Sequence, residues 1–277
     1  MKPFDVVQRK IGRCLFIFDH GLGDFILFMP VFKEFIRQTQ VNVKLASSTK
    51  RQFHLINPSI VNIDNDFNKR QYSYVYRICY PDPQNTSIPI DVSDESSKPY
   101  ICAVYELGLK EFVWKPYRIT NKNFNPNSKR IGVHFFGHTG MDKKFCPVST
   151  AERVWNEIVE AGYEPFEVHM TPKFANEYPD FLEAETLDCI NDKCSLRFEE
   201  PNLGRMIEEI GKCRFFIGID SGPVYLASAL LGVDHIIGLE NQKRHNNFLP
   251  KHIVTIPVMG YVPGTTYKQI KMKEKYT

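Results

Sequence analysis

The chain lacks any uninterrupted apolar run of the roughly 20 residues that a membrane-spanning helix needs. Its longest candidate, residues 25–36, is interrupted by Lys33 and Glu34. The N-terminal residues 1–13 contain no apolar segment of the kind that marks a secretory signal. An excess of charge of one sign is also missing, because the formal net charge is only +3. This total neither requires nor excludes a nucleic-acid partner, since local clustering matters more.

Closely spaced cysteine pairs of the kind found in redox and zinc motifs are missing as well. The sequence contains seven cysteines but no Cys-x-x-Cys, and Cys189 and Cys194 have no second pair with which to form a four-ligand zinc site. An odd number of thiols placed beside apolar residues is typical of small buried side chains in a reducing compartment. We therefore expect a cytoplasmic protein without a metal site.

The composition indicates a globular protein, with 43% hydrophobic and 24% charged residues. A length of 277 residues exceeds the usual domain size of roughly 100–200 residues, so two domains are expected. The polar, Asn-rich segment 120–129 is the best candidate for a linker. We predict an N-terminal domain over 1–125 and a C-terminal domain over 126–277, with a tail that could return to the first domain.

The pattern in the first half predicts a βαβ unit and hence a parallel sheet covered by helices. A buried strand ends in a tight turn at His20-Gly21-Leu22-Gly23, and a helix follows it. The elements expected in this half are strands at 14–18, 41–46, 60–63 and 74–78, helices at 23–37 and 106–111, and a loop over 80–100.

The second half repeats this alternation, which predicts a second Rossmann-like domain and an α/β fold overall. Ser149 and Glu152 have the spacing of a capping box, and Gly162 would end that helix. The elements expected here are strands at 131–135, 166–170, 214–219 and 235–239, helices near 149–161, 203–210 and 222–231, and a Lys-rich tail at 267–277 that forms a helix or a mobile end.

The strongest candidate site is the strand, short turn and helix over 216–232. This geometry points free backbone N–H groups at an anion, and Gly222 lets a phosphate approach the backbone. Ser221 could cap the helix or bond a phosphate oxygen. Asp220 would repel a phosphate, so it fits better as a cap or as an acceptor for a ligand hydroxyl. An ordinary capped helix without ligand fits the same residues.

Two further turns follow predicted strands. Gly23 would place Asp24 at the start of a helix, where the carboxylate either caps the helix or serves as a general base in a cleft between the domains. After the strand 131–135, Lys143 and Lys144 either neutralise a diphosphate or form a solvated pair.

In combination these three sites resemble the heptosyltransferase-like glycosyltransferases, glycosyltransferase family 9. The motifs that carry the resemblance are, in chain order, Gly23-Asp24 with Pro30, Lys144-x-x-Pro147, and Asp220-Ser221-Gly222-x-x-x-Leu226-Ala227. It spans roughly residues 13–258. The resemblance implies GT-B architecture, two facing Rossmann-like domains. It also implies inverting transfer from a nucleotide-diphosphate sugar as co-substrate, with no cofactor and no essential metal.

The resemblance assigns Asp24 as the base, with His20, Gly21 and Gly23 in the acceptor-side loop. It assigns donor binding to Lys144 with its neighbour Lys143, and to the set Asp220, Ser221, Gly222 and Tyr225. Tyr225 stands where the family has a histidine, and Cys146 stands where it has a tryptophan.

The acceptor class stays open at this point. Basic residues interleave with tyrosines in the first domain, as at Arg70, Tyr72, Tyr76 and Arg77, which suits a phosphorylated glycan such as lipopolysaccharide core. The same pattern suits DNA with an extruded base. A solvated surface with core tyrosines fits these residues as well. Two other readings stay open: a polypeptide acceptor, and a non-catalytic protein that only binds a nucleotide sugar, which Tyr225 in place of the family histidine would support.

Overall fold

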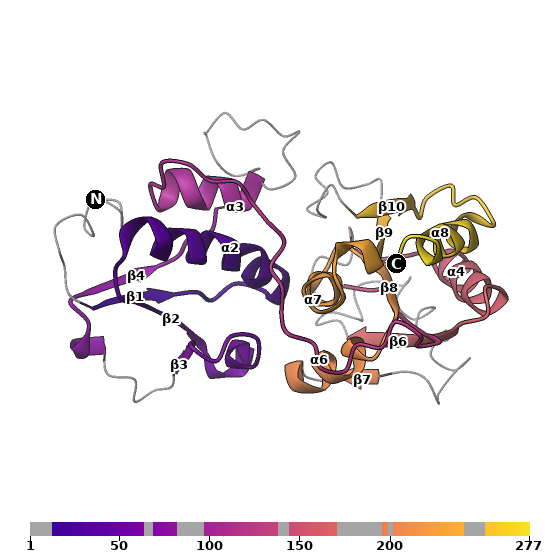
Figure 1. The fold of residues 1–277 in the computed structure, drawn as a ribbon, viewed down its shortest axis with the longest axis horizontal. Helices are drawn as coiled ribbons and strands as arrows, with labels where there is room; N and C mark the ends of the chain where they lie inside the picture. Colours follow the sequence, from indigo (N-terminus) through magenta and orange to yellow (C-terminus); the bar gives the residue numbers. More distant parts are fainter. Residues whose placement is uncertain are drawn as a thin grey trace. The chain divides into compact units, whose positions relative to one another are not determined.

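The computed structural model describes residues 13–63, 69–81, 97–137, 144–170, 196–198, 202–240 and 253–277. The chain divides into two compact units, Met1–Tyr117 and Arg118–Thr277, and each is an α/β structure with a parallel sheet (Figure 1). The segment predicted as a linker belongs to the second unit. There the Ile119 amide donates to the Ala229 carbonyl at 2.9 Å, and the Asn121 side chain donates to the Gly211 carbonyl at 3.0 Å.

The first unit contains a four-stranded parallel sheet of order β3-β2-β1-β4. Its strands are β1 (Cys14–Ile17), β2 (Val43–Ser48), β3 (Val61–Ile63) and β4 (Tyr74–Arg77), and its helices are α2 (Leu22–Thr39) and α3 (Ser97–Ile101), with a π-helical turn at Cys102–Glu106 and 3₁₀ turns at Thr49–Arg51, Phe53–Leu55 and Lys69–Gln71. The sequence predicts the four strands and the first helix, with ends that differ by one or two residues.

Aromatic side chains hold α2 against this sheet. Every residue of β1 is buried, which explains its unbroken apolar sequence. Phe16 packs its ring 5.0 Å from that of Phe35, and Phe18 stacks on Phe28 at 4.7 Å between centroids. The start of α2 is thereby fixed over the carboxyl end of β1.

The strand order places a topological switch point between β1 and β4. The chain runs from β1 outward to β2 and β3, then returns to pair β4 with the other side of β1. In open parallel sheets, ligands bind at the carboxyl ends of the strands at such a point. The loop after β1 and the residues after β4 therefore border the natural ligand-binding edge of this unit.

The second unit contains a six-stranded parallel sheet of order β10-β9-β8-β5-β6-β7. Its elements are β5 (Arg130–His134), α4 (Val148–Glu160), β6 (Glu164–Met170), β7 (Leu196–Phe198), α6 (Leu203–Gly211), β8 (Phe215–Ile219), α7 (Gly222–Leu231), a 3₁₀ turn (Val233–His235), β9 (Ile236–Glu240), β10 (Val254–Pro257) and α8 (Thr265–Glu274). Here the switch point lies between β5 and β8.

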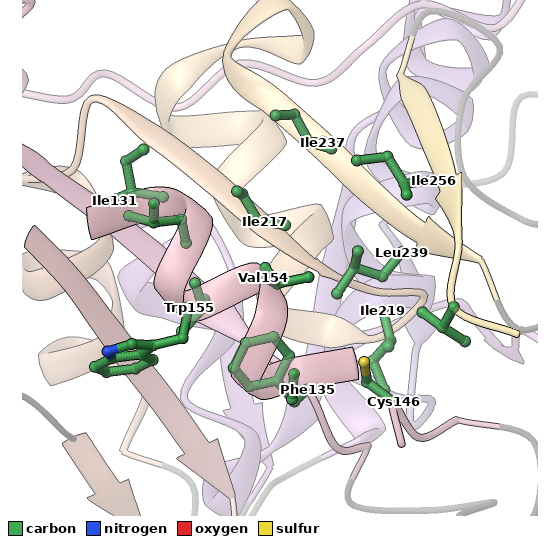
Figure 2. Close-up of a cluster of buried hydrophobic side chains, with 14 of the residues drawn as sticks. Ile131, Phe135, Cys146, Val154, Trp155, Ile217, Ile219, Ile237, Leu239 and Ile256 are labelled. Atoms are coloured by element: carbon green, nitrogen blue, oxygen red, sulfur yellow. The ribbon is translucent and has the colours of Figure 1, made fainter. Parts of the chain in front are cut away.

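The core of the second unit lies between this sheet and α4. Figure 2 shows side chains of β8, such as Ile217 and Ile219, beside Leu239 of β9, with Val154 of α4 close to them. All four of these side chains are almost fully buried. This packing fixes the carboxyl end of β8, from which the candidate site begins.

Two local predictions are wrong. The helix expected at 106–111 ends instead at Glu106, because Gly108 has φ +77° and the Leu107 amide closes the preceding turn onto the Cys102 carbonyl. Ser149 caps nothing, since α4 already begins at Val148 and the Pro147 carbonyl accepts the first amide bonds.

The structure also decides two other predictions, the end of α4 and the form of the C-terminal tail. Gly162, with φ +87°, follows the end of α4 as expected. The C-terminal tail forms α8, which packs on α4 within the second unit. Among the described residues, no helix has the length and apolar character needed to cross a membrane.

Candidate functional site

The turn after β8 has the geometry that the sequence predicts. Ser221 is the N-cap residue of α7, but its hydroxyl bonds the Ile219 carbonyl at 3.3 Å and does not cap the helix. The Ser221 carbonyl receives the amide of Val224 at 3.1 Å. Among the described residues no acceptor takes the Gly222 amide. The first turn of α7 therefore offers a backbone donor and the positive end of its dipole.

Asp220 is held by a residue of the same helix. The Tyr225 hydroxyl donates to Asp220 Oδ1 at 2.7 Å, and both side chains are more than nine-tenths buried. The carboxylate therefore accepts a hydrogen bond from a protein hydroxyl, and its expected role toward a ligand hydroxyl stays a prediction. Tyr225, which stands where the family that the sequence resembles has a histidine, thus fixes the acidic residue of the turn.

A close approach of three elements supports this turn. Gly218 lies in β8, and a Cβ added there would stand 2.9 Å from the His134 carbonyl oxygen of β5 and 2.8 Å from Val224 Cγ2 of α7. The buried His134 lies with Nδ1 2.6 Å from the Val168 carbonyl oxygen of β6. Only glycine leaves room for α7 to begin so near to both strands.

Lys144 lies beyond the carboxyl end of β5, the strand next to β8. The Gly137 amide donates to the Lys144 carbonyl at 2.8 Å, and the Cys146 amide donates to the Phe135 carbonyl at 2.9 Å. The structure therefore places Lys144 and the turn at Asp220 after neighbouring strands of one sheet edge. Lys143 lies outside the described residues. So does the polar segment 242–247, whose sequence suits either a contact with phosphate or an ordinary polar loop.

In the first unit, Asp24 is the third residue of α2. Its carboxylate lies in the first turn, where it favours the helix dipole as expected, but it does not cap the helix, because the N-cap residue is Gly21. Instead Lys98 Nζ donates to Asp24 Oδ1 at 2.7 Å. Gly21 is the N-cap residue, with extended backbone, and Gly23 is buried in the first turn. The α2 N-terminus adds its own positive potential to that of Lys98 around the carboxylate.

His20 contributes to the same edge of the first unit. Its Nε2 lies 3.1 Å from the Ile78 carbonyl oxygen, which joins the loop after β1 to the residues after β4. Its ring also packs 5.0 Å from that of Phe18. His20 is therefore tied into the switch point, where it lies close to Asp24 in the sequence.

No sequence pattern pointed to Lys98. It comes from α3, which begins within the segment 80–100 predicted as loop, and it lies 74 residues from Asp24. The aromatic side chain beside it, Tyr80, is almost fully buried and has φ +46°. Burial raises the pKa of the Tyr80 hydroxyl well above its usual range, and the Asp24 carboxylate adds to this rise.

Several of the basic and tyrosine side chains that suggested an acceptor site contact other residues of the first unit. Tyr74 and Tyr76 stack on one another at 6.3 Å. Arg77, the last residue of β4, pairs with the carboxylate of Asp19, and Arg51 donates to the Asp19 carbonyl at 3.1 Å. These two guanidinium groups therefore gather at the carboxyl edge of the first sheet.

Comparison with known proteins supports the fold. No protein-family model matches the sequence, and no curated protein is significantly similar to it. Three solved structures are similar over almost the whole chain. E. coli ADP-heptose LPS heptosyltransferase II has a TM-score of 0.64 and 12% identity, covering 95% of this chain and 99% of its own.

The other two structures also match over more than nine-tenths of both chains. E. coli heptosyltransferase WaaC with ADP has a TM-score of 0.60 and 12% identity, covering 95% of this chain and 98% of that one. The glycosyl transferase family 9 protein of Veillonella parvula DSM 2008 has a TM-score of 0.59 and 13% identity, and the match covers 96% of this chain and 92% of that one. The chain therefore has the GT-B type of α/β fold found in these glycosyltransferases, as the sequence resemblance predicts.

Proposed function

We propose that the protein is a glycosyltransferase that moves a sugar from a nucleotide-diphosphate sugar to a hydroxyl group of an acceptor. The observation that carries this proposal is the turn at Asp220, Ser221 and Gly222. It lies at the switch point of the second sheet, opens α7 with an available backbone donor, and belongs to a chain with the fold of heptosyltransferases.

The second unit is proposed to bind the donor. The N-terminus of α7 suits the negative charge of a diphosphate, and Lys144 supplies a cation from the neighbouring strand end. Asp220, fixed by Tyr225, suits a sugar or ribose hydroxyl. One of the similar structures is a heptosyltransferase with ADP, so a nucleoside diphosphate is a ligand of this fold.

The first unit is proposed to supply the base. The Asp24 carboxylate accepts the proton of the acceptor hydroxyl as that oxygen forms a bond to the anomeric carbon. The bond between the anomeric carbon and the diphosphate oxygen breaks, and its electron pair leaves with the nucleoside diphosphate. The α7 N-terminus and Lys144 stabilise the charge that develops there. Attack opposite to the leaving group inverts the anomeric configuration.

An anionic glycan such as lipopolysaccharide core is the acceptor class that we favour. Arg77 is largely exposed at the carboxyl edge of the first sheet, near the loop that leads to Asp24. Guanidinium groups bind phosphate and carboxylate well. A DNA or polypeptide acceptor gains no support from the three similar structures. A cytoplasmic location stays a prediction from the cysteine usage.

A panel of nucleotide sugars tests this function. ADP-heptose, UDP-glucose, UDP-N-acetylglucosamine and GDP-mannose would each be added to the purified protein, followed by thermal shift and by nucleoside-diphosphate release. We expect at least one to raise the unfolding temperature and to be hydrolysed slowly, with no effect of EDTA. Binding without any release above background would indicate a non-catalytic binding protein. If none of the four sugars is bound and none is cleaved, the proposal is contradicted.

Tyr225→Phe tests the donor turn. The change removes the hydroxyl that donates to the buried Asp220, and a lost hydrogen bond to a charged group costs about 1.5–3 kcal/mol. We expect a lower unfolding temperature and about tenfold weaker binding of the best donor in the panel. Tyr267→Phe, an exposed position of α8, is the control and should bind as the wild type does. Unchanged donor binding in the Tyr225→Phe variant would show that Asp220 needs no such support.

A further inference from the structure

The ion pair between Lys98 and Asp24 is more enclosed than a surface pair. Lys98 Nζ lies 2.7 Å from Asp24 Oδ1, and the Lys98 side chain is only 14% exposed, against 32% for Asp24. Exposed ion pairs contribute little to stability, with a median of about 0–1 kcal/mol, so folding alone gives weak reason to bury a lysine here. The pair also joins two segments of the first unit that are distant in sequence, α2 and α3.

The surroundings fix the lysine in place. Its ammonium group lies 4.9 Å from the centroid of the Tyr80 ring, a cation–π distance. Tyr80 is in turn packed 5.5 Å from the ring of Phe18 and 5.9 Å from that of Phe28. Its left-handed backbone is held by Glu106, whose Oε2 accepts the Tyr80 amide at 3.0 Å. These contacts hold the Lys98 ammonium group in place beside Oδ1 of Asp24.

We infer that Lys98 is a positioning residue for Asp24: it binds Oδ1 and directs the second oxygen of the carboxylate to the acceptor hydroxyl. This inference rests on the proposed function of Asp24 as the base. Oδ2 makes no hydrogen bond to any described residue, so it is the oxygen that can take the acceptor proton. Lys98 does not contact the reacting atoms.

Other titratable groups lie around this pair. They are Tyr80 and Cys102 beside Lys98, Glu106 behind Tyr80, and His20 before α2. Burial raises the pKa of Tyr80 and of Cys102 well above the usual range, so both stay neutral near pH 7. All of these residues are retained when Lys98 is replaced, so a change in rate reports on the lost ammonium group.

Lys98→Met and Lys98→Arg test the inference, with Lys110→Met as a matched control because Lys110 is exposed on the same unit. Steady-state nucleoside-diphosphate release would be followed with the panel sugar that the wild type cleaves fastest. The kcat of the Lys98→Met variant should fall about tenfold or more, because misplacement of a catalytic group is costly.

The remaining measurements separate positioning from folding. The donor KM should change by less than about twofold, because the donor is proposed to bind the second unit, and Lys98→Arg should restore most of the lost kcat. Lys98→Gln replaces Lys98→Met if that variant fails to fold. An active wild type whose neutral Lys98 variant keeps the wild-type kcat overturns the role of Lys98 alone. An inactive wild type overturns the proposed function itself.

Discussion

Replacement of Asp24 by asparagine should lower the rate of sugar transfer by about 10²–10⁴-fold, the usual contribution of a general base. Asparagine keeps the shape of the side chain but cannot take a proton from the acceptor. Donor binding should stay within about twofold of the wild type, because the proposed donor contacts all belong to the second unit, whereas Asp24 belongs to the first. Initial rates with the best panel sugar and calorimetric titration of its nucleoside diphosphate measure the two effects separately.

Glu34→Gln is the matched control for this change. Glu34 lies about three turns further along α2 and is also ion-paired, with Arg37 at 2.6 Å. That arginine holds the pKa of Glu34 below its usual range, although the pair is partly solvated. Loss of this pair should leave the rate nearly unchanged. Wild-type transfer by the Asp24→Asn protein would show that another group accepts the proton.

The parts that the sequence predicts well are those decided by local patterns. β1 and α7 are recognisable because buried strands and helices read as short apolar runs between turn residues, and both elements lie where the residues indicate. The turn at Ser221 follows for the same reason, since a buried strand ends just before it and Pro223 suits the first turn of a helix.

The parts that could not be predicted depend on long-range contacts. Lys98 reaches Asp24 across 74 positions, and no periodic pattern records which lysine meets a given carboxylate. The capping box at Ser149 failed because α4 begins one residue earlier, at Val148, and its first amides bond to a backbone carbonyl. The contact of Tyr225 with Asp220 was within reach of sequence reasoning, because the two residues are five positions apart at a helix start.

Gly218→Ala should destabilise the second unit and weaken donor binding together. The new Cβ would lie 2.9 Å from a backbone oxygen of β5 and 3.1 Å from the His134 Cβ, and neither can move without shifting the strand. Overpacking of this kind costs about 1–3 kcal/mol, which corresponds to a fall of roughly 3–10 °C in Tm for a unit of this size. Differential scanning calorimetry and donor titration measure both effects.

The loss of donor affinity should exceed what destabilisation alone explains. The same Cβ would stand 2.8 Å from Val224 Cγ2, in the first turn of α7, so the protein can relieve the clash by moving the helix start away from β8. That movement carries Gly222 and Ser221 with it, and we expect donor binding to weaken at least about tenfold at a temperature where the variant is still folded. Gly21→Ala is the control for stability, because there the nearest atom to a new Cβ is Asp24 Oδ2 at 3.6 Å and φ is −65°. Both variants add one methyl group close to the start of a helix, Gly218 in the strand before α7 and Gly21 at the N-cap of α2. A fall in Tm and affinity confined to Gly218→Ala would therefore assign the effect to the junction of β5, β8 and α7. Equal donor affinity in both variants at that temperature would instead show that the donor does not depend on the start of α7.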